Sequence, residues 1–249
     1  YEWYDLLRKF LTNRNELFLV IDKRQSLYSQ DLIWVEGGMK NVEFRGPWRE
    51  LKRIYRLPKI IGNMANDFSK IFCLNQEVQI EEYKQLTIFE AYKDPHLIWE
   101  NIDSAEWMDK INKAYEKIKI TQIELGVGHP SDTVILLPNH KRGMELVRNF
   151  KKRGIEVNHV FGDSSEESCY NKSSFYTGDS RLKMSTIHSF KGWEAVNVIL
   201  LIPFDWLGSE DNLNALVYVA MTRAQVNLIV LNCNQRYSEF GGKLPSIWQ

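Results

Sequence analysis

The chain has 249 residues, of which 44% are hydrophobic and 26% are charged, and its 32 basic and 32 acidic residues give a formal net charge of zero. This length allows one large or two modest domains, and the neutral total excludes recognition of a polyanion by overall charge. A mostly basic stretch over residues 40–59 is the exception, and phosphate binding and a plain solvated surface are both open for it.

Three cysteines, Cys73, Cys169 and Cys233, stand far apart and form no C-x-x-C pair. Their scatter argues against a zinc site and a disulfide framework, and it fits a reducing compartment, so we expect a cytoplasmic or nucleoid-associated protein. No apolar run is long enough to span a membrane, and no membrane partner is expected. Because the chain begins with Tyr1 rather than Met, we expect a fragment, and the lack of a signal peptide is uninformative.

The first half of the sequence alternates helical patterns with short apolar runs. The run 17–21 is continuously apolar, as in buried parallel strands, and Pro58 stands where a helix begins. The elements expected here are a helix over 1–11, a strand over 17–21, a short strand over 51–56, a helix over 58–72, a strand over 84–92 and a helix beginning at Ser104.

The second half continues this alternation. Strands are expected over 133–137, 157–161, 181–186, 196–202 and 226–231, and helices over 141–152 and 213–224. Residues 163–179 are rich in Ser, Gly and charge, and we expect a mobile loop there. Alternating strands and helices predict an α/β fold with a mostly parallel sheet and helices on both faces, in which ligands bind beyond the carboxyl ends of the strands.

Four polar runs lie beside the ends of the predicted strands. They are Asp22-Lys-Arg-Gln25-Ser-Leu-Tyr28, Ile54-Tyr55-Arg56-Leu-Pro58, Thr186-Ile-His188-Ser189-Phe-Lys-Gly192-Trp-Glu194 and Tyr218-Val-Ala-Met-Thr-Arg223-Ala. In order and spacing they resemble motifs III, IV, V and VI of superfamily 1 helicases of the UvrD/Rep/PcrA type. The resemblance covers nearly the whole chain and implies a RecA-like fold of the P-loop NTPase type.

The nucleotide-binding half of such a helicase is missing from the sequence. There is no G-x-x-x-x-G-K-[ST] run, and no Asp-Glu pair follows an apolar strand before Leu17. The resemblance therefore implies a remnant of the first RecA-like domain over 1–48, a second RecA-like domain over 49–235 and a C-terminal tail over 236–249. The short segment between Val160 and Arg181 implies that no large inserted subdomain is present.

By resemblance, three residues would act on ATP. Arg56 and Arg223 match arginines that approach the γ-phosphate, and a guanidinium suits this task because it stays charged and meets phosphate oxygens with two N–H groups. Gln25 matches the residue that senses the γ-phosphate. The alternatives are a surface cation for Arg56, a cation at a helix C-terminus for Arg223 and an ordinary loop glutamine for Gln25.

Three further residues would hold the nucleoside. Tyr55 matches the side chain that stacks on adenine, Glu194 matches the acid that contacts the ribose, and Gly192 allows close backbone approach. A core tyrosine and an exposed turn glutamate remain the alternatives for Tyr55 and Glu194.

Contacts to nucleic acid would come from Tyr28, Thr186, His188 and Ser189. Hydroxyl and imidazole groups can donate to backbone phosphates without reading bases, and Tyr28 could stack on a base. Ser29-Gln-Asp31 follows Tyr28 where the family has an aromatic residue and an arginine, and Leu213-Asn-Ala-Leu216 stands where it has Glu-x-Arg-Arg. These departures leave the base contacts open.

The resemblance therefore predicts the C-terminal half of an ATP-dependent DNA helicase or translocase. Its expected partners are single-stranded DNA, with RNA not excluded, and an N-terminal RecA-like domain. ATP and Mg²⁺ would bind in the whole protein, whereas the fragment alone would hold neither tightly and would not hydrolyse ATP. A non-catalytic nucleic-acid-binding or partner-docking module, and a helicase fused to a nuclease, are the alternatives.

Overall fold

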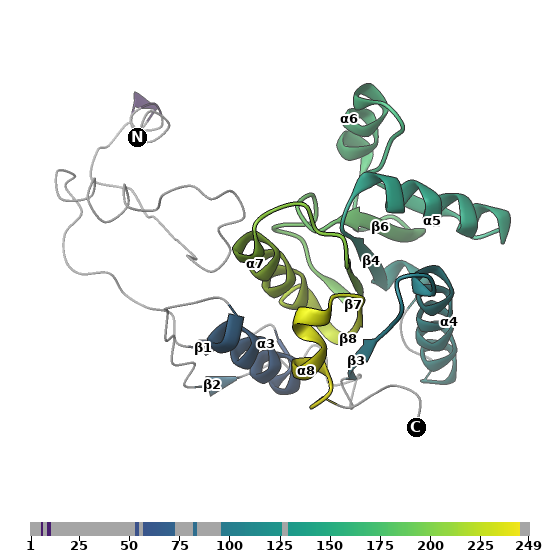
Figure 1. Ribbon diagram of the computed structural model, residues 1–249. Coiled ribbons are helices and arrows are strands. Elements are labelled where there is room, and N and C mark those ends of the chain that lie inside the picture. Colours follow the sequence, from purple (N-terminus) through teal and green to yellow (C-terminus); the bar gives the residue numbers. More distant parts are fainter. Residues whose placement is uncertain are drawn as a thin grey trace.

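The computed structural model describes residues 6, 9–10, 53–54, 57–72, 82–83, 96–125 and 129–244. At its centre is a six-stranded sheet (Figure 1). Its strands are β3 (Leu97–Asn101), β4 (Thr133–Leu137), β5 (Val157–His159), β6 (Leu182–Thr186), β7 (Ala195–Ile202) and β8 (Ala224–Asn232). The order is β3-β8-β7-β4-β6-β5, and each neighbouring pair is parallel. A separate parallel pair joins β1 (Arg53–Ile54) to β2 (Glu82–Tyr83).

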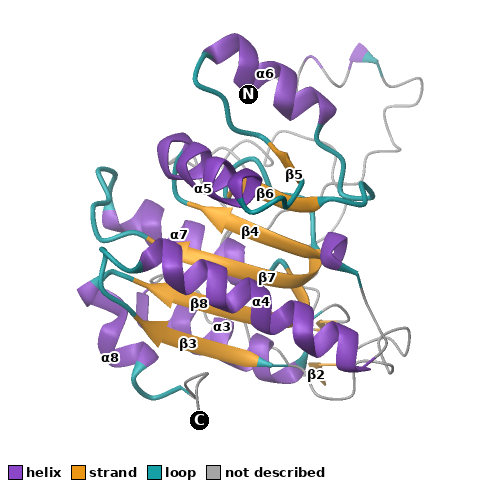
Figure 2. Ribbon diagram, turned by 90° about the vertical axis from the view of Figure 1, so that its right-hand side faces the viewer, coloured by secondary structure: helices purple, strands orange, loops and turns teal. Residues whose placement is uncertain are grey.

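Helices cover both faces of this sheet. They are α3 (Lys59–Phe72), α4 (Trp107–Leu125), α5 (His140–Lys152), α6 (Ser165–Ser174), α7 (Glu210–Met221) and α8 (Ser238–Gly241), with 3-10 turns at Pro130–Asp132 and Gln235–Tyr237. Figure 2 shows α4 and α5 in front of the sheet and α3, α7 and α8 behind it. The predicted α/β class, with a parallel sheet between two helical layers, is confirmed.

The central strands are apolar because both of their faces are covered. Every residue of β4 is buried, and the six residues from Asn197 to Ile202 in β7 are buried as well. A strand with one exposed face has a polar residue at about every second position, whereas a strand covered on both faces does not need one. Polar exceptions are paired, since the Asn197 amide donates to Thr133 Oγ1 at 3.2 Å and accepts from Asn227 at 2.7 Å.

An aromatic cluster fastens α3 and the C-terminal segment to the edge of the sheet that β3 forms. Phe68 of α3 is fully buried, and its ring lies 5.3 Å from that of Tyr237 and 5.5 Å from that of Phe240. The Tyr237 hydroxyl donates to Asn214 of α7 at 2.7 Å. Tyr237, the second residue of the predicted tail over 236–249, thus belongs to the core.

The structure corrects several expected elements. The supposed mobile loop over 163–179 contains α6, whose first N–H groups are capped by Ser164, with Glu166 and Glu167 in the first turn. These groups satisfy donors that a helix start leaves open, so a polar segment can still be helical. The sequence analysis also missed β3, because Leu97–Asn101 is short and lies between polar residues.

Other expected elements differ in their bounds or are not described. Helix α7 ends at Met221 instead of continuing to Ala224, and β8 begins at Ala224, so Arg223 lies in the turn between them. The expected strands over 17–21 and 84–92, and most of the expected helix over 1–11, lie outside the described residues.

We expect Phe68→Ala to lower the free energy of unfolding by about 3–5 kcal/mol, because the cavity left in the aromatic cluster cannot close fully. The matched control is Ile71→Ala on the same helix, where 60% of the side chain is exposed and the change should be within about 0.5 kcal/mol. Urea unfolding of both variants measures the difference. Equal stabilities would show that α3 is not fastened through Phe68.

Candidate functional site

The predicted motif V residues form a closed turn at the carboxyl end of β6. Thr186 is the last residue of the strand, and its Oγ1 accepts the Ser189 N–H at 3.1 Å and donates to Ser189 Oγ at 3.0 Å. The Phe190 N–H donates to the Thr186 carbonyl at 3.0 Å, and the Phe190 ring is buried. These bonds fix the positions of Thr186, His188 and Ser189 relative to one another.

His188 is half-buried in this turn. Burial disfavours the charged imidazolium and lowers the pKa of His188 below its ordinary value. The imidazole is therefore held in its neutral form near pH 7, with one nitrogen as a donor and the other as an acceptor. A neutral ring can donate one hydrogen bond to a phosphate oxygen without adding a charge.

Gly192 ends the turn with a left-handed backbone, at φ = +92°, which favours glycine over residues with a Cβ. A Cβ built there would meet nothing within 4 Å, so the backbone of Gly192 is open on that side. Trp193 and Glu194 follow with exposed side chains, and β7 begins at Ala195. An accessible peptide next to a carboxylate is a suitable contact for a polar ligand.

Arg223 lies beside this turn. Its Nε donates to the Val219 carbonyl at 3.0 Å and its Nη2 to Thr222 Oγ1 at 3.0 Å, while its Nη1 lies 3.5 Å from the Trp193 carbonyl. Only 3% of the residue is exposed. The last contact joins the predicted motif V and motif VI segments, which stand 30 residues apart in the sequence.

The site residues lie at both ends of the strands: some at the carboxyl edge, where strands end, and others at the amino edge, where strands begin. Thr186 pairs with Leu137 where β6 and β4 end, whereas Ala195 pairs with Ala224 where β7 and β8 begin. Glu194 and Arg223 directly precede this second pair, so they lie at the amino edge. Ligands of a parallel sheet are expected beyond the carboxyl ends of its strands, whereas Glu194 and Arg223 lie at the opposite edge, because residues 187–194 cross the sheet from one edge to the other.

The remaining predicted site residues, Gln25, Tyr28, Tyr55 and Arg56, lie outside the described residues. The chain is described again directly after Arg56, where Leu57 and Pro58 are buried at the start of α3.

One cation at the carboxyl edge escaped the sequence analysis. The Arg142 guanidinium lies 5.6 Å from the Trp107 ring and 5.7 Å from the Phe204 ring, and its Nη2 donates to Asp205 at 3.0 Å. Its side chain is 11% exposed, and its Nη1 is buried without a hydrogen-bond partner. Arg142 belongs to no recognisable run, so only the fold reveals that it meets Phe204.

Two classes of site find no support in the part of the chain that is described. No three His, Cys, Asp or Glu side chains there lie close enough together to hold a metal ion. Among the helices of the same residues, none has both the length and the hydropathy to cross a membrane.

Burial raises the pKa of the Cys233 thiol to about 11, so this thiol is a poor nucleophile at neutral pH.

Thr186→Val should destabilise the fold by about 1–3 kcal/mol, because the Ser189 N–H would lose its acceptor in a half-buried turn. Thr186→Ser keeps the hydroxyl and should cost less than about 1 kcal/mol. Thermal unfolding of the two variants checks this difference. If valine and serine were equivalent, the hydroxyl would not close the turn.

No protein-family model matches the sequence, and no curated protein matches it. Among solved structures, the chain is similar to the C-terminal domain of a possible DNA helicase from Lactobacillus plantarum WCFS1, with 15% identity, a TM-score of 0.44 and coverage of 72% of this chain and 87% of that one. It is also similar to the C-terminal domain of the DEAD-box protein Dbp5, with 16% identity, a TM-score of 0.42 and coverage of 61% and 88%. For the C-terminal part of the Fun30 ATPase domain these values are 15%, 0.34, 59% and 49%. At such identities, the likenesses concern the course of the backbone and carry nothing about ligands or activity.

Proposed function

We propose that the chain is the C-terminal part of an ATP-dependent superfamily 1 DNA helicase or translocase. Its second RecA-like domain would close on a nucleotide that another domain holds with a P-loop and Mg²⁺. The observation that carries this proposal is the meeting of two helicase-like runs in space, where Arg223 Nη1 lies 3.5 Å from the Trp193 carbonyl. Two runs recognised separately in the sequence thus share one edge of the sheet.

The amino edge would face ATP. Hydrolysis spreads negative charge over the γ-phosphoryl oxygens, and a cation from a facing domain stabilises that charge by electrostatic attraction. Arg223 would supply this cation together with Arg56, and Gln25 would sense the γ-phosphate. Glu194 would bind the ribose, the Gly192 backbone would approach the nucleotide and Tyr55 would stack on adenine.

Arg223 is not poised for this role in the structure described. Only 3% of the residue is exposed, and its guanidinium donates to the carbonyl and hydroxyl oxygens of its own turn. Under the proposal, closure of the two domains exchanges some of these bonds for bonds to phosphate. Such an exchange keeps the donors satisfied in both states and makes the cation available only when nucleotide is present.

The carboxyl edge would hold single-stranded nucleic acid. His188 and Ser189 would offer an imidazole and a hydroxyl group from one closed turn, in which the buried Thr186 hydroxyl holds Ser189, and Tyr28 would add a stacking surface. Contacts to phosphates are independent of sequence, as a motor that moves along any strand requires. Residues 187–194 begin with this turn and end at Glu194, so one short segment joins the carboxyl edge of the sheet to its amino edge.

The burial of Arg223 also favours a second candidate, a nucleic-acid-binding or partner-docking module that kept the helicase fold without catalysis. In such a module Arg223 would stabilise the turn between α7 and β8 and never meet a phosphate. The two candidates differ in what Arg223 does in a protein that also contains the P-loop domain.

In that larger protein, we expect Arg223→Lys to lower DNA-stimulated ATP turnover by about 10²–10³-fold, because lysine keeps the charge but loses the fork of donors that meets the γ-phosphate. Arg236→Lys is the matched control, because Arg236 lies in an exposed ion pair with Glu210, and its turnover should be unchanged. Phosphate release and thermal unfolding are measured for both. Unchanged turnover in a stably folded Arg223→Lys protein would favour the non-catalytic module.

The 249-residue chain should bind a fluorescein-labelled dT16 oligonucleotide with an affinity that falls as salt rises. Ser189→Glu should weaken this binding at least about tenfold, because a carboxylate would face the phosphates. Lys113 lies on α4, outside the predicted path of the oligonucleotide, and its side chain is 59% exposed. Lys113→Glu should therefore change the affinity for the oligonucleotide little. Fluorescence anisotropy measures both. A larger loss of affinity for Lys113→Glu than for Ser189→Glu would show that the oligonucleotide binds elsewhere on the chain.

A further inference from the structure

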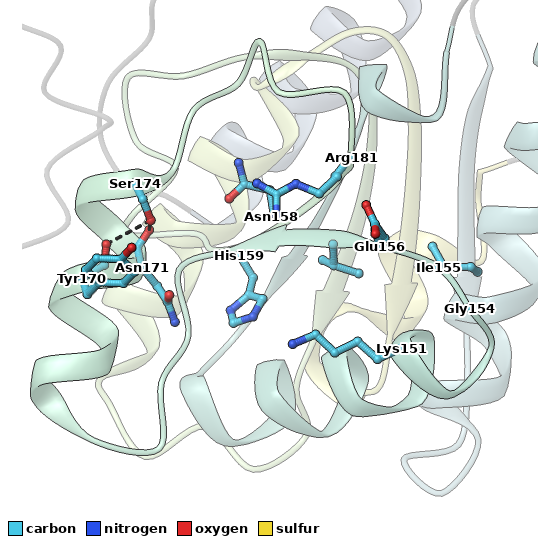
Figure 3. A pocket seen from close by; sticks show the side chains of 11 residues that line it. Lys151, Gly154, Ile155, Glu156, Asn158, His159, Tyr170, Asn171, Ser174 and Arg181 are labelled. Atoms are coloured by element: carbon cyan, nitrogen blue, oxygen red, sulfur yellow. Dashed lines mark hydrogen bonds between the residues drawn. The ribbon is translucent and has the colours of Figure 1, made fainter.

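A groove runs along the free edge of the sheet, on the outer side of β5. It encloses about 690 Å³ between the last turn of α5, the strand β5 and the helix α6 (Figure 3). Residues 154–159 line it without interruption, so the groove follows the strand. Tyr170, Asn171 and Ser174 of α6 form the opposite wall.

The floor of this groove is an unused strand edge. β5 is the last strand in the order of the sheet and pairs only with β6 in this part of the chain. The Val160 N–H donates to Met184 of β6 at 3.3 Å, and backbone groups of alternate residues point to the same side of a strand. Asn158 therefore also faces β6, while Val157 and His159 turn their N–H and C=O groups toward the groove.

The shape of the groove selects its occupant. An open edge is a template for another strand, and natural proteins usually cover or shorten it. Here the edge is recessed between α5 and α6, so the same edge of a second copy, recessed to the same extent, could not reach it. A single extended segment can enter, and a partner strand beside Val157–His159 would run for roughly 10 Å.

The charges differ between the two sides of β5. On the side of Asn158, the Arg181 guanidinium is already neutralised, because it donates to both carboxylate oxygens of Asp179, at 2.9 and 2.6 Å. On the other side, the Lys151 side chain extends toward His159 in Figure 3 and forms no ion pair within the described residues. His159 Nδ1 is buried without a hydrogen-bond partner.

The acidic groups near this side do not neutralise Lys151. Glu167 accepts a hydrogen bond from the Asp163 N–H at 2.8 Å, and Glu156 lies near Arg181. Burial lowers the pKa of His159, and the charge of Lys151 adds to this effect, so the ring is neutral beside the ammonium group. An incoming carboxylate would thus find the Lys151 ammonium without an ion-pair partner among the described residues.

We propose that this groove binds an extended acidic segment of a partner protein, which adds a strand to β5 and places a carboxylate beside Lys151. Main-chain bonds to Val157 and His159 supply affinity that is independent of sequence. Side chains of an added strand alternate between its two faces, so one residue meets Lys151 while its two neighbours turn to the other face. An acidic residue is therefore selected at the position beside Lys151.

The first experiment pans a phage library of random heptapeptides on the 249-residue chain. We expect enrichment of peptides that share an Asp or Glu at one position of the aligned sequences. Enrichment of basic or unpatterned peptides, or no enrichment, would overturn the proposal. The dT16 oligonucleotide is then added as a competitor, and its displacement of the peptide from the groove would show that the groove binds nucleic acid instead.

The second experiment measures the affinity of an enriched, fluorescein-labelled peptide for three variants. Val157→Pro removes an outward N–H without breaking a bond to β6, so it should weaken binding at least about tenfold while the fold persists. Lys151→Glu should weaken binding to a similar extent. Lys152→Glu, on the adjacent exposed lysine that does not line the groove, is the matched control and should bind as the unchanged chain does.

A further measurement covers the case in which Val157→Pro does not fold. Hydrogen exchange of the His159 amide in the unchanged chain should slow by at least about tenfold when the peptide is bound, because its outward N–H becomes a ladder donor. Unchanged exchange, or equal binding by Lys151→Glu and Lys152→Glu, would contradict strand addition at β5.

Discussion

The parallel pairing of β7 with β8 at their first residues is the constraint on which the candidate site depends. The Ala195 N–H donates to the Arg223 carbonyl at 3.0 Å, and Ala195 and Ala224 are partners in the register. This bond places the end of the predicted motif V against the end of the predicted motif VI. Without it, Glu194 and Arg223 would be unrelated loop residues, and the proposed nucleotide edge would not exist.

Burial of a guanidinium is costly unless its donors are satisfied. Arg223 meets this condition through acceptors in its own turn, the Val219 carbonyl and the Thr222 hydroxyl, and the Thr222 hydroxyl itself donates to the Val219 carbonyl at 2.8 Å. The turn between α7 and β8 is thus organised around the arginine. A catalytic and a structural role can therefore belong to the same side chain in different states of the protein.

Much of the fold follows from local patterns in the sequence. The apolar runs in β4 and β7 predicted buried parallel strands, because a covered sheet needs apolar residues on both faces. The pattern failed where tertiary contacts decide the outcome. Leu97–Asn101 becomes a strand by pairing with β8, more than a hundred residues away, and α6 is a helix with little apolar face of its own.

The sequence indicated candidate residues for a site but not their arrangement, and the roles of these residues stay predictions. The turn after Thr186 and the arginine after Thr222 were recognisable by their order and spacing, and the structure brings these two segments together. Their division between opposite edges was not predictable, because a sequence does not reveal that eight residues return across the whole sheet. The burial of Arg223 and the aromatic surroundings of Arg142 also depend on distant elements.

The connection between β6 and β7 has a mechanical consequence. Thr186 is level with Leu137 of β4 and so with Leu201 of β7, and the eight residues must return along the six positions from Leu201 to Ala195, roughly 20 Å. A fully extended segment of eight residues reaches about 26–29 Å. Six of the eight are coiled into the turn that ends at Gly192, so little slack remains. A pull on one end of this segment is therefore transmitted to the other end as tension, or it unwinds the turn.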